Sequence, residues 1–373
     1  MNSKKPLFIL PRTSYIDSRI YFSSHLKYHM TEDNVEFLSW EDEIQTSKLP
    51  EKAKHTLIKY MHNQKNSGFP LIWELKHFAY IVNINTQILS NIINSTEYFY
   101  RSFNIPKKRG GHRNISSPYP ALLDIQHWIL SNILKNIKLS AFSHGYIENK
   151  SIITNATEHL GNSHLLKIDI KDFFPSIPIN RVIAVFQNCG YPNHIAYMLA
   201  RVCCLDNSLP QGASTSPYLS NIILKRLDNR VNGLSAKFSL KYTRYADDIC
   251  VSGKHIPIKL IEYIYSIIED EGFIANKEKT ILIRGKGKKI VTGISISNNE
   301  LKLPRSTKRK LRQEVHYLST RGFFEHTNHL NRHDPLYIER ILGKLQFWKS
   351  IEPNNEYVVK SINLIKTLQN TKY

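Results

Sequence analysis

Two adjacent aspartates, Asp247 and Asp248, stand between two short segments rich in apolar, aromatic and β-branched residues. The segments 238–245 and 249–252 have the length and composition of strands, so the pattern predicts a hairpin with the aspartates at its turn. Two carboxylates side by side repel each other, and a bound divalent cation reverses the sign of that interaction. Aspartates also favour turns for local reasons, so the pair taken alone favours an ordinary structural turn.

A third aspartate, Asp169, ends the apolar segment 165–170, which is predicted to be another strand. Mg²⁺ prefers hard oxygen ligands, and one or two carboxylates together with substrate phosphates commonly hold it. The middle of the chain alternates strands with helices, whereas both ends have mostly helical spacing. Helices are expected at 122–137, 179–188, 194–204, 217–231 and 259–271, and further strands at 279–283 and 290–296.

The charge of the chain points to an anionic partner. There are 51 Lys and Arg against 31 Asp and Glu, a formal charge of +20. Such a surplus is unfavourable by self-repulsion, and it favours a nucleic-acid partner over a generally basic surface. Basic residues gather at 101–113, where two glycines predict a flexible turn, and again at 302–312. The acidic segment 32–43 is either a solvated face or a docking surface for a basic partner.

The remaining composition excludes several classes of protein. No apolar run approaches the roughly 18 residues needed to span a bilayer, and the N-terminus lacks the apolar core of a secretory signal. We therefore expect no contact with a membrane. The four cysteines lack metal-ligand spacing, and Cys203 and Cys204 are adjacent. This excludes a zinc site and favours buried thiols in a reducing cytoplasm.

Four segments, taken in order and with their separations, resemble the motifs of reverse transcriptases. Residues 169–177 resemble the motif of the first catalytic aspartate, and residues 209–217 resemble the glutamine–glycine motif that begins a palm helix. Residues 245–248 are similar to the tyrosine-x-aspartate-aspartate motif, and residues 272–280 to the block that follows it. The resemblance covers about residues 100–350, and it implies an α+β, right-hand polymerase fold with an antiparallel palm sheet.

The same resemblance implies a division of the chain. Residues 1–100 are expected to form an N-terminal helical region with part of the fingers, and residues 101–164 the fingers with the basic nucleotide-binding turn. Residues 165–300 are expected to form the palm, with a helical insert at about 178–208 shared with the fingers. Residues 301–373 are expected to form a helical, basic thumb, and no RNase H-like segment is expected after it.

The resemblance also implies a two-metal mechanism. Two Mg²⁺ ions about 3.5–4 Å apart can activate an attacking hydroxyl and stabilise a leaving pyrophosphate. Three aspartates are implied as the catalytic residues, and a backbone carbonyl is implied as a further metal ligand. The expected ligands are Asp169, Ile170 through its carbonyl, Asp247 and Asp248.

A second set of matched residues is expected around the incoming nucleotide. An aromatic ring beneath the sugar leaves no room for a 2′-hydroxyl and so selects deoxynucleotides. Phe174 is matched to that position, although either Phe174 or Phe173 must pack in the core. Lys279 is either a proton donor to the pyrophosphate or a solvated lysine. The expected nucleotide-binding residues are Lys108, Arg113, Phe174, Gln211 and Lys279, with Lys107 and Arg109 as alternatives in the basic turn.

Two further segments resemble elements of bacterial retron reverse transcriptases. Residues 155–159 match an asparagine-alanine-x-x-histidine element, and residues 291–293 match a valine-threonine-glycine element. The resemblance implies recognition of a cognate RNA by Asn155, His159, Val291, Thr292 and Gly293. The structural alternatives are a helix cap, a satisfied histidine and a strand end. A basic thumb is implied to grip the duplex through Arg305, Lys308, Arg309 and Arg312.

The retron resemblance implies a reaction and a set of partners. The enzyme is expected to use dNTPs to copy a structured non-coding RNA into single-stranded DNA, starting from the 2′-hydroxyl of a guanosine. The product is a branched RNA–DNA hybrid called msDNA. A host RNase H is expected to act on this hybrid, and an effector protein encoded nearby is expected to join it in anti-phage defence. The alternatives are another bacterial reverse transcriptase of the group II intron-like type and a non-catalytic RNA-binding protein on the same fold.

Overall fold

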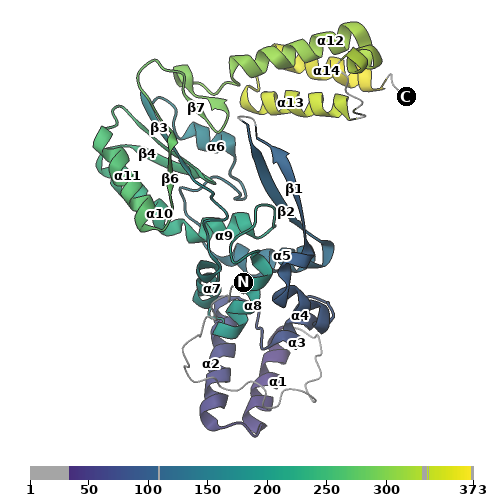
Figure 1. The fold of residues 1–373 in the computed structure, drawn as a ribbon, viewed down its shortest axis with the longest axis vertical. Helices are drawn as coiled ribbons and strands as arrows, with labels where there is room; N and C mark the ends of the chain where they lie inside the picture. The colour runs from purple at the N-terminus through teal and green to yellow at the C-terminus, as the bar shows by residue number, and fades with distance from the viewer. Residues whose placement is uncertain (1–32, 108–109, 330–333, 335, 371–373) are drawn as a thin grey trace, which may run out of the picture.

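The structure, a computed structural model, describes residues 33–107, 110–329, 334 and 336–370 of the 373-residue chain. Its centre is a four-stranded sheet in the order β4-β5-β3-β6, in which neighbouring strands are antiparallel (Figure 1). The strands are β3 (His164–Ile170), β4 (Lys241–Tyr245), β5 (Asp248–Gly253) and β6 (Ala275–Ile283). The hairpin predicted around the paired aspartates and the strand predicted before Asp169 are therefore confirmed, and they lie side by side.

Apolar side chains explain the central position of β3 and β5. Ile168 and Ile170 of β3 are buried, and β5 is buried at every residue after its first. Full burial of such side chains stabilises the fold by about 1.5–3 kcal/mol each. Helices α10 (Lys225–Lys237) and α11 (Ile258–Asp270) pack against each other, and they contact the sheet at β4 and β6 (Figure 1).

Three segments differ from the sequence predictions. The helix expected at 217–231 is two helices, α9 (Ser216–Ile223) and α10, which meet at Leu224. The strand expected at 290–296 is a short hairpin of β7 (Ile290–Val291) and β8 (Ile294–Ser295), because the two residues between them both have positive φ. The helix expected at 122–137 ends earlier. It consists of α5 (Pro120–Asn132) and a 3₁₀ turn at Leu134–Asn136.

The basic segment predicted as a flexible turn is the end of a β-hairpin. Strand β1 (Tyr100–Pro106) pairs with β2 (His112–Pro118) along its whole length. All residues of β1 after Tyr100 are exposed, so the strand lacks the alternation of buried and exposed residues that identifies a strand in sequence. Gly110 and Gly111 have φ of 89° and 77°, so their positive φ closes the turn as the sequence predicts.

The N-terminal helices and a helical insert form one lobe at the end of the molecule opposite the C-terminal bundle (Figure 1). The Gln64 side chain donates to the Cys189 carbonyl at 3.1 Å, and the Tyr191 hydroxyl donates to the Pro70 carbonyl at 2.9 Å. These bonds join segments more than a hundred residues apart. The helices are α1 (Asp33–Thr46), α2 (Glu51–Ser67), α3 (Leu75–Ile81), α4 (Thr86–Asn94), α7 (Ile179–Asn188) and α8 (Asn193–Cys203).

The C-terminal helices form a bundle with a core of its own. They are α12 (Arg305–His329), α13 (Tyr337–Ile351) and α14 (Glu356–Asn370), and Trp348 is fully buried among them. The β7–β8 hairpin and the short helix α6 (Ile152–Thr157) belong to this second core through Val291 and Ala156. In the described part of the chain, no helix combines the length and apolar character needed to cross a membrane.

Candidate active site

The three predicted catalytic aspartates lie together at one end of the central strands. Asp169 is the penultimate residue of β3, and it is paired in register with Asp248, the first residue of β5. Cβ atoms of residues paired in this way lie about 4.5–5.5 Å apart. Asp247 precedes Asp248 in the turn, and its carbonyl accepts a hydrogen bond from the Ile170 N–H at 3.1 Å. Strand pairing therefore brings together residues that are far apart in the sequence.

Burial and mutual repulsion disfavour the charged forms of these carboxyl groups. Burial, followed by the charges of Asp248 and Asp169, raises the pKa of Asp247 to about 6. Burial also raises the pKa of Asp248, although the Lys167 cation opposes that shift. Lys279 donates to Asp169 Oδ2 at 2.9 Å, and this hydrogen bond raises the pKa of the lysine. Lys279 is thus a direct neighbour of the carboxylates and not merely a solvated residue.

The chemistry of these donors fits Mg²⁺. Among the residues that the structure describes, no three His, Cys, Asp or Glu side chains gather into a ready-made metal cluster. The three aspartates nevertheless supply hard carboxylate oxygens, and their repulsion is relieved by a divalent cation. Mg²⁺ is typically held by one or two carboxylates with waters and substrate phosphates, so a sparse protein site is sufficient.

The glutamine–glycine segment lies against the β1–β2 hairpin. The Ser116 N–H in β2 donates to the Gln211 carbonyl at 2.8 Å. A Cβ atom at Gly212 would lie 2.5 Å from the Ser116 carbonyl oxygen, and its φ is 132°, so only glycine fits. Arg113 is exposed on the same strand, whereas Lys108 and Arg109 lie outside the described residues. The structure thus connects the predicted nucleotide-binding segments through the backbone.

Two adjacent phenylalanines have different surroundings. The Phe173 ring is buried, whereas the Phe174 ring is only partly buried and lies 6.5 Å from the ring of Tyr146. Tyr146 also lies 6.3 Å from the ring of Tyr245 beside the catalytic turn, and it is 46% exposed. Burial and the charge of Asp247 raise its pKa. Tyr146 was not predicted from the sequence, because it belongs to no linear motif and reaches the site only through the fold.

The asparagine and histidine expected to recognise RNA are fully buried, which corrects that expectation. The neutral His159 ring donates from Nε2 to Thr243 at 2.7 Å and accepts at Nδ1 from Ser252 at 2.7 Å. The Thr243 hydroxyl donates to Asn155 Oδ1 at 2.5 Å. Burial lowers the pKa of His159 to about 3, in agreement with a neutral ring. Both side chains use their polar atoms inside the protein, so neither reaches RNA directly.

Thr292 and Gly293 form the two-residue turn of the β7–β8 hairpin. Their φ values are 44° and 87°, as a type I′ turn requires. Positive φ is rare for a β-branched residue such as threonine. Here Thr292 donates to the Ile152 carbonyl at 3.2 Å and accepts from Asn155 Nδ2 at 3.4 Å. The two retron-like elements therefore contact each other, and Val291 is buried in the second core.

The basic residues predicted to grip a duplex divide into two kinds. Arg305 and Arg309 are exposed on α12. Lys308 instead lies 2.6 Å from a carboxylate oxygen of Glu352 and is mostly buried, which corrects its assignment to the binding surface. Arg312 lies over the rings of Trp348 and Tyr357, so part of its side chain packs within the bundle.

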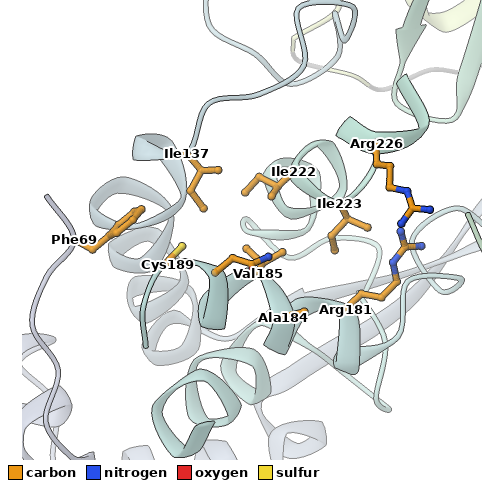
Figure 2. Close-up of a pocket in the computed structure, with 10 residues that line it drawn as sticks. Phe69, Ile137, Arg181, Ala184, Val185, Cys189, Ile222, Ile223 and Arg226 are labelled. Atoms are coloured by element: carbon orange, nitrogen blue, oxygen red, sulfur yellow. The ribbon is translucent and has the colours of Figure 1, made fainter. Parts of the chain in front are cut away.

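A separate hollow lies between α7 and α9 (Figure 2). It encloses about 530 Å³, and apolar side chains line it together with two arginines. The lining contains no carboxylate and none of the predicted site residues. The candidate site is therefore at the sheet end and not in this hollow. The lining residues include Phe69, Ile137, Arg181, Val185, Ile222 and Arg226.

Comparison with known proteins finds a family model, several similar sequences and similar solved structures. The family model described as reverse transcriptase (RNA-dependent DNA polymerase) matches residues 105–321. The retron Ec86 reverse transcriptase of Escherichia coli is 35% identical over 258 residues, which is 68% of this chain and 81% of that protein. The retron Mx162 reverse transcriptase of Myxococcus xanthus is 31% identical over 256 residues, which is 59% of this chain and 53% of that protein. A solved telomerase structure from Candida albicans, in complex with a fragment of telomeric RNA, matches with a TM-score of 0.42 and 11% identity. It covers 72% of this chain and 63% of that one.

Proposed function

The chain belongs to the reverse transcriptase family, in its bacterial retron branch, and on this premise we propose that the three aspartates at the sheet end catalyse its RNA-directed DNA synthesis. The observation that carries this proposal is the register pairing of Asp169 with Asp248, with Asp247 beside them. The three aspartates lie at the ends of paired strands, so the proposed site is built on the central sheet.

Two Mg²⁺ ions, when bound, would activate the attacking hydroxyl and stabilise the leaving pyrophosphate. The side chains of the three aspartates and the carbonyl of Ile170 would hold them. The Lys279 ammonium group donates a hydrogen bond to Asp169 Oδ2 and partly neutralises the carboxylates. During synthesis the same lysine holds a proton within reach of the leaving group.

The incoming dNTP is proposed to lie between the β1–β2 hairpin and the catalytic turn. Arg113 and Lys108 bind the triphosphate. Gln211 lies beside the nucleotide, held by the bond from the Ser116 N–H. Phe174, whose partly buried ring faces Tyr146, excludes the 2′-hydroxyl of ribonucleotides.

The natural template is proposed to be a cognate structured RNA, copied from the 2′-hydroxyl of a guanosine to give msDNA. The identity of 35% to the retron Ec86 reverse transcriptase supports this choice over another bacterial reverse transcriptase. A host RNase H would then remove template from the hybrid, and a nearby effector protein would act with it in defence against phage. Asn155 and His159 contribute indirectly, because they fix the Thr292–Gly293 turn from inside the protein.

Replacement of one aspartate tests the catalytic assignment. Asp247→Asn removes a charge that repels its neighbours, so we expect the folded protein to keep its melting temperature and its RNA binding. DNA synthesis in Mg²⁺ should be abolished, both on the cognate RNA and on an annealed primer. Asp172→Asn is the matched control, since Asp172 is exposed in the same motif and asparagine tolerates its φ of 45°. Normal synthesis by Asp247→Asn would refute the assignment.

A further inference from the structure

A buried ion pair lies directly behind the catalytic turn. Arg244 in β4 and Asp228 in α10 are both completely buried. The Arg244 Nε donates to Asp228 Oδ1 at 2.7 Å, and Nη2 donates to Oδ2 at 2.8 Å. The pairing is therefore bidentate, which is the strongest arrangement available to these two groups. The Tyr242 hydroxyl also donates to Asp228 Oδ1, at 2.7 Å.

The third nitrogen of the guanidinium group reaches the turn itself. Arg244 Nη1 donates to the carbonyl of Ala246 at 3.0 Å and to Asn221 Oδ1 at 3.1 Å. Ala246 immediately precedes Asp247, and its φ of 56° is unusual for a residue other than glycine. Such a conformation persists only where the surrounding structure determines it. The Arg244 hydrogen bond is one of the contacts that determine it.

The turn is also in close contact with the backbone of Gly145. A Cβ atom at Gly145 would lie 2.8 Å from the Ala246 nitrogen, so glycine is needed for this approach. Asn221 in α9 donates to the Gly145 carbonyl at 2.7 Å, while it accepts from Arg244. The same asparagine thus connects the Gly145 backbone to the ion pair. Ala246 is therefore in close contact with Gly145 and hydrogen-bonded to Arg244, and Asn221 bonds to both of these residues.

We propose that Arg244 is a positioning residue for the reaction, because its hydrogen bond to Ala246 sets the place of Asp247 and Asp248. The inference rests on the proposed catalytic role of those aspartates. Apolar side chains of similar volume often replace a buried ion pair without loss of stability. No apolar side chain, however, donates a hydrogen bond to the Ala246 carbonyl. Stability and catalysis should therefore separate when the pair is replaced.

Two variants test this separation. The first is the triple variant Arg244→Met, Asp228→Leu and Tyr242→Phe, which removes the buried charges and the hydroxyl that depends on them. The second is Arg244→Lys, which keeps a cation for Asp228 but cannot reproduce the bidentate pair together with the bond to Ala246. Tyr242→Phe alone is the matched control, because its hydroxyl bonds to the same Asp228 oxygen without touching the turn.

The measurements are the melting temperature, kcat and KM for a dNTP on an annealed primer, and hydrogen exchange of a peptide that spans residues 244–249. We expect the triple variant to melt close to the wild type, with kcat lower by about 100-fold, as for a misplaced catalytic group. The KM for the dNTP should change less than kcat, and exchange in the turn should become faster. Arg244→Lys should show the same direction of change, whereas Tyr242→Phe should leave kcat and turn exchange unchanged.

A folded triple variant with wild-type kcat and exchange would overturn the proposal. If the triple variant does not fold, kcat and turn exchange in Arg244→Lys decide the question. If neither variant folds, the ion pair is required for folding and the positioning role is rejected. Equal losses in Tyr242→Phe and Arg244→Lys would also count against a positioning role. The exchange measurement does not depend on the catalytic role of the aspartates, which Asp247→Asn tests by itself. A failure of the positioning proposal can therefore be distinguished from a failure of the catalytic assignment.

Discussion

At the scale of single residues, the two phenylalanines after the first aspartate make a sharp comparison. Phe174→Ala should raise ribonucleotide incorporation relative to deoxynucleotide incorporation, because it opens space for a 2′-hydroxyl beside the sugar. The expected change in the ratio is at least about tenfold, because truncation of the ring relieves the steric rejection of the 2′-hydroxyl. Incorporation efficiencies for matched ribo- and deoxynucleotides on one template measure it.

Phe173→Ala is the control for this experiment. Its ring is buried, so truncation should destabilise the protein by about 3–5 kcal/mol while the ratio stays unchanged. If the ratio shifts in Phe173→Ala and stays unchanged in Phe174→Ala, the residue that excludes ribonucleotides is Phe173, and the assignment to Phe174 is wrong.

The sequence is informative about residues whose chemistry is tied to a linear motif, and Asp169, Asp247 and Asp248 are of this kind. Arg244 is not. An arginine in a strand is expected to be exposed, since arginine is rarely buried unless it is paired. Its partner Asp228 lies on a helix, sixteen positions away, and only the packing of α10 against β4 brings the two together. Lys308 shows the converse error, because a basic run predicts a binding surface while Glu352 holds this lysine within the bundle.

At the scale of elements, the contact between α6 and the β7–β8 hairpin predicts a variant that loses self-primed synthesis but keeps extension of an annealed primer. Thr292→Gly accepts the positive φ but removes the hydrogen bonds to Ile152 and Asn155. One such bond contributes about 1 kcal/mol, so the melting temperature should fall only by a few degrees. Self-primed synthesis on the cognate RNA should fall by about tenfold or more, whereas extension of an annealed 3′ primer should be spared.

The matched control for the hairpin is Gly293→Ala. Nothing lies within 4 Å of the added Cβ, so this change strains the backbone without a clash and keeps both Thr292 bonds. It should lower the melting temperature and leave the ratio of self-primed synthesis to annealed-primer extension unchanged. Equal loss of self-primed and annealed-primer synthesis by folded Thr292→Gly would mean that the turn is a purely structural feature.

Strands were predictable from the sequence where at least one face is buried, and they were missed where both faces are exposed. The apolar residues of β3 and β5 predict strands. In contrast, β1 is exposed along almost its whole length, and its sequence predicts a loop. The break at Leu224 and the hairpin at Thr292–Gly293 depend on the backbone conformation of one or two residues. Periodicity does not report such local changes, so one helix and one strand were expected where each is divided in two.

At the scale of the whole molecule, the charge of +20 should make nucleic-acid binding strongly dependent on salt. Arg309→Ala removes one exposed cation from α12, so the slope of log K against log salt should become shallower by about 1. Binding to the cognate RNA and to an unrelated duplex should weaken alike. Titrations of labelled RNA at several salt concentrations measure this slope.

The neighbouring residue supplies the control. Lys308 is paired with Glu352, so Lys308→Met should lower the melting temperature and leave the salt slope unchanged. If Lys308→Met changes the slope and Arg309→Ala does not, the assignment of the two side chains to interior and surface is reversed.

The pairing of β3 with β6 has a consequence for folding of the chain during its synthesis on the ribosome. The Asn276 side chain that bonds Asp169 lies 107 residues further along the chain, and contacts at such separations form slowly. While β6 is still unsynthesised, one edge of β3 has no partner, and an unpaired strand edge invites association with other chains. The nascent polypeptide therefore acquires its full sheet, and with it a complete set of neighbours for Asp169, only after residue 283 has been added.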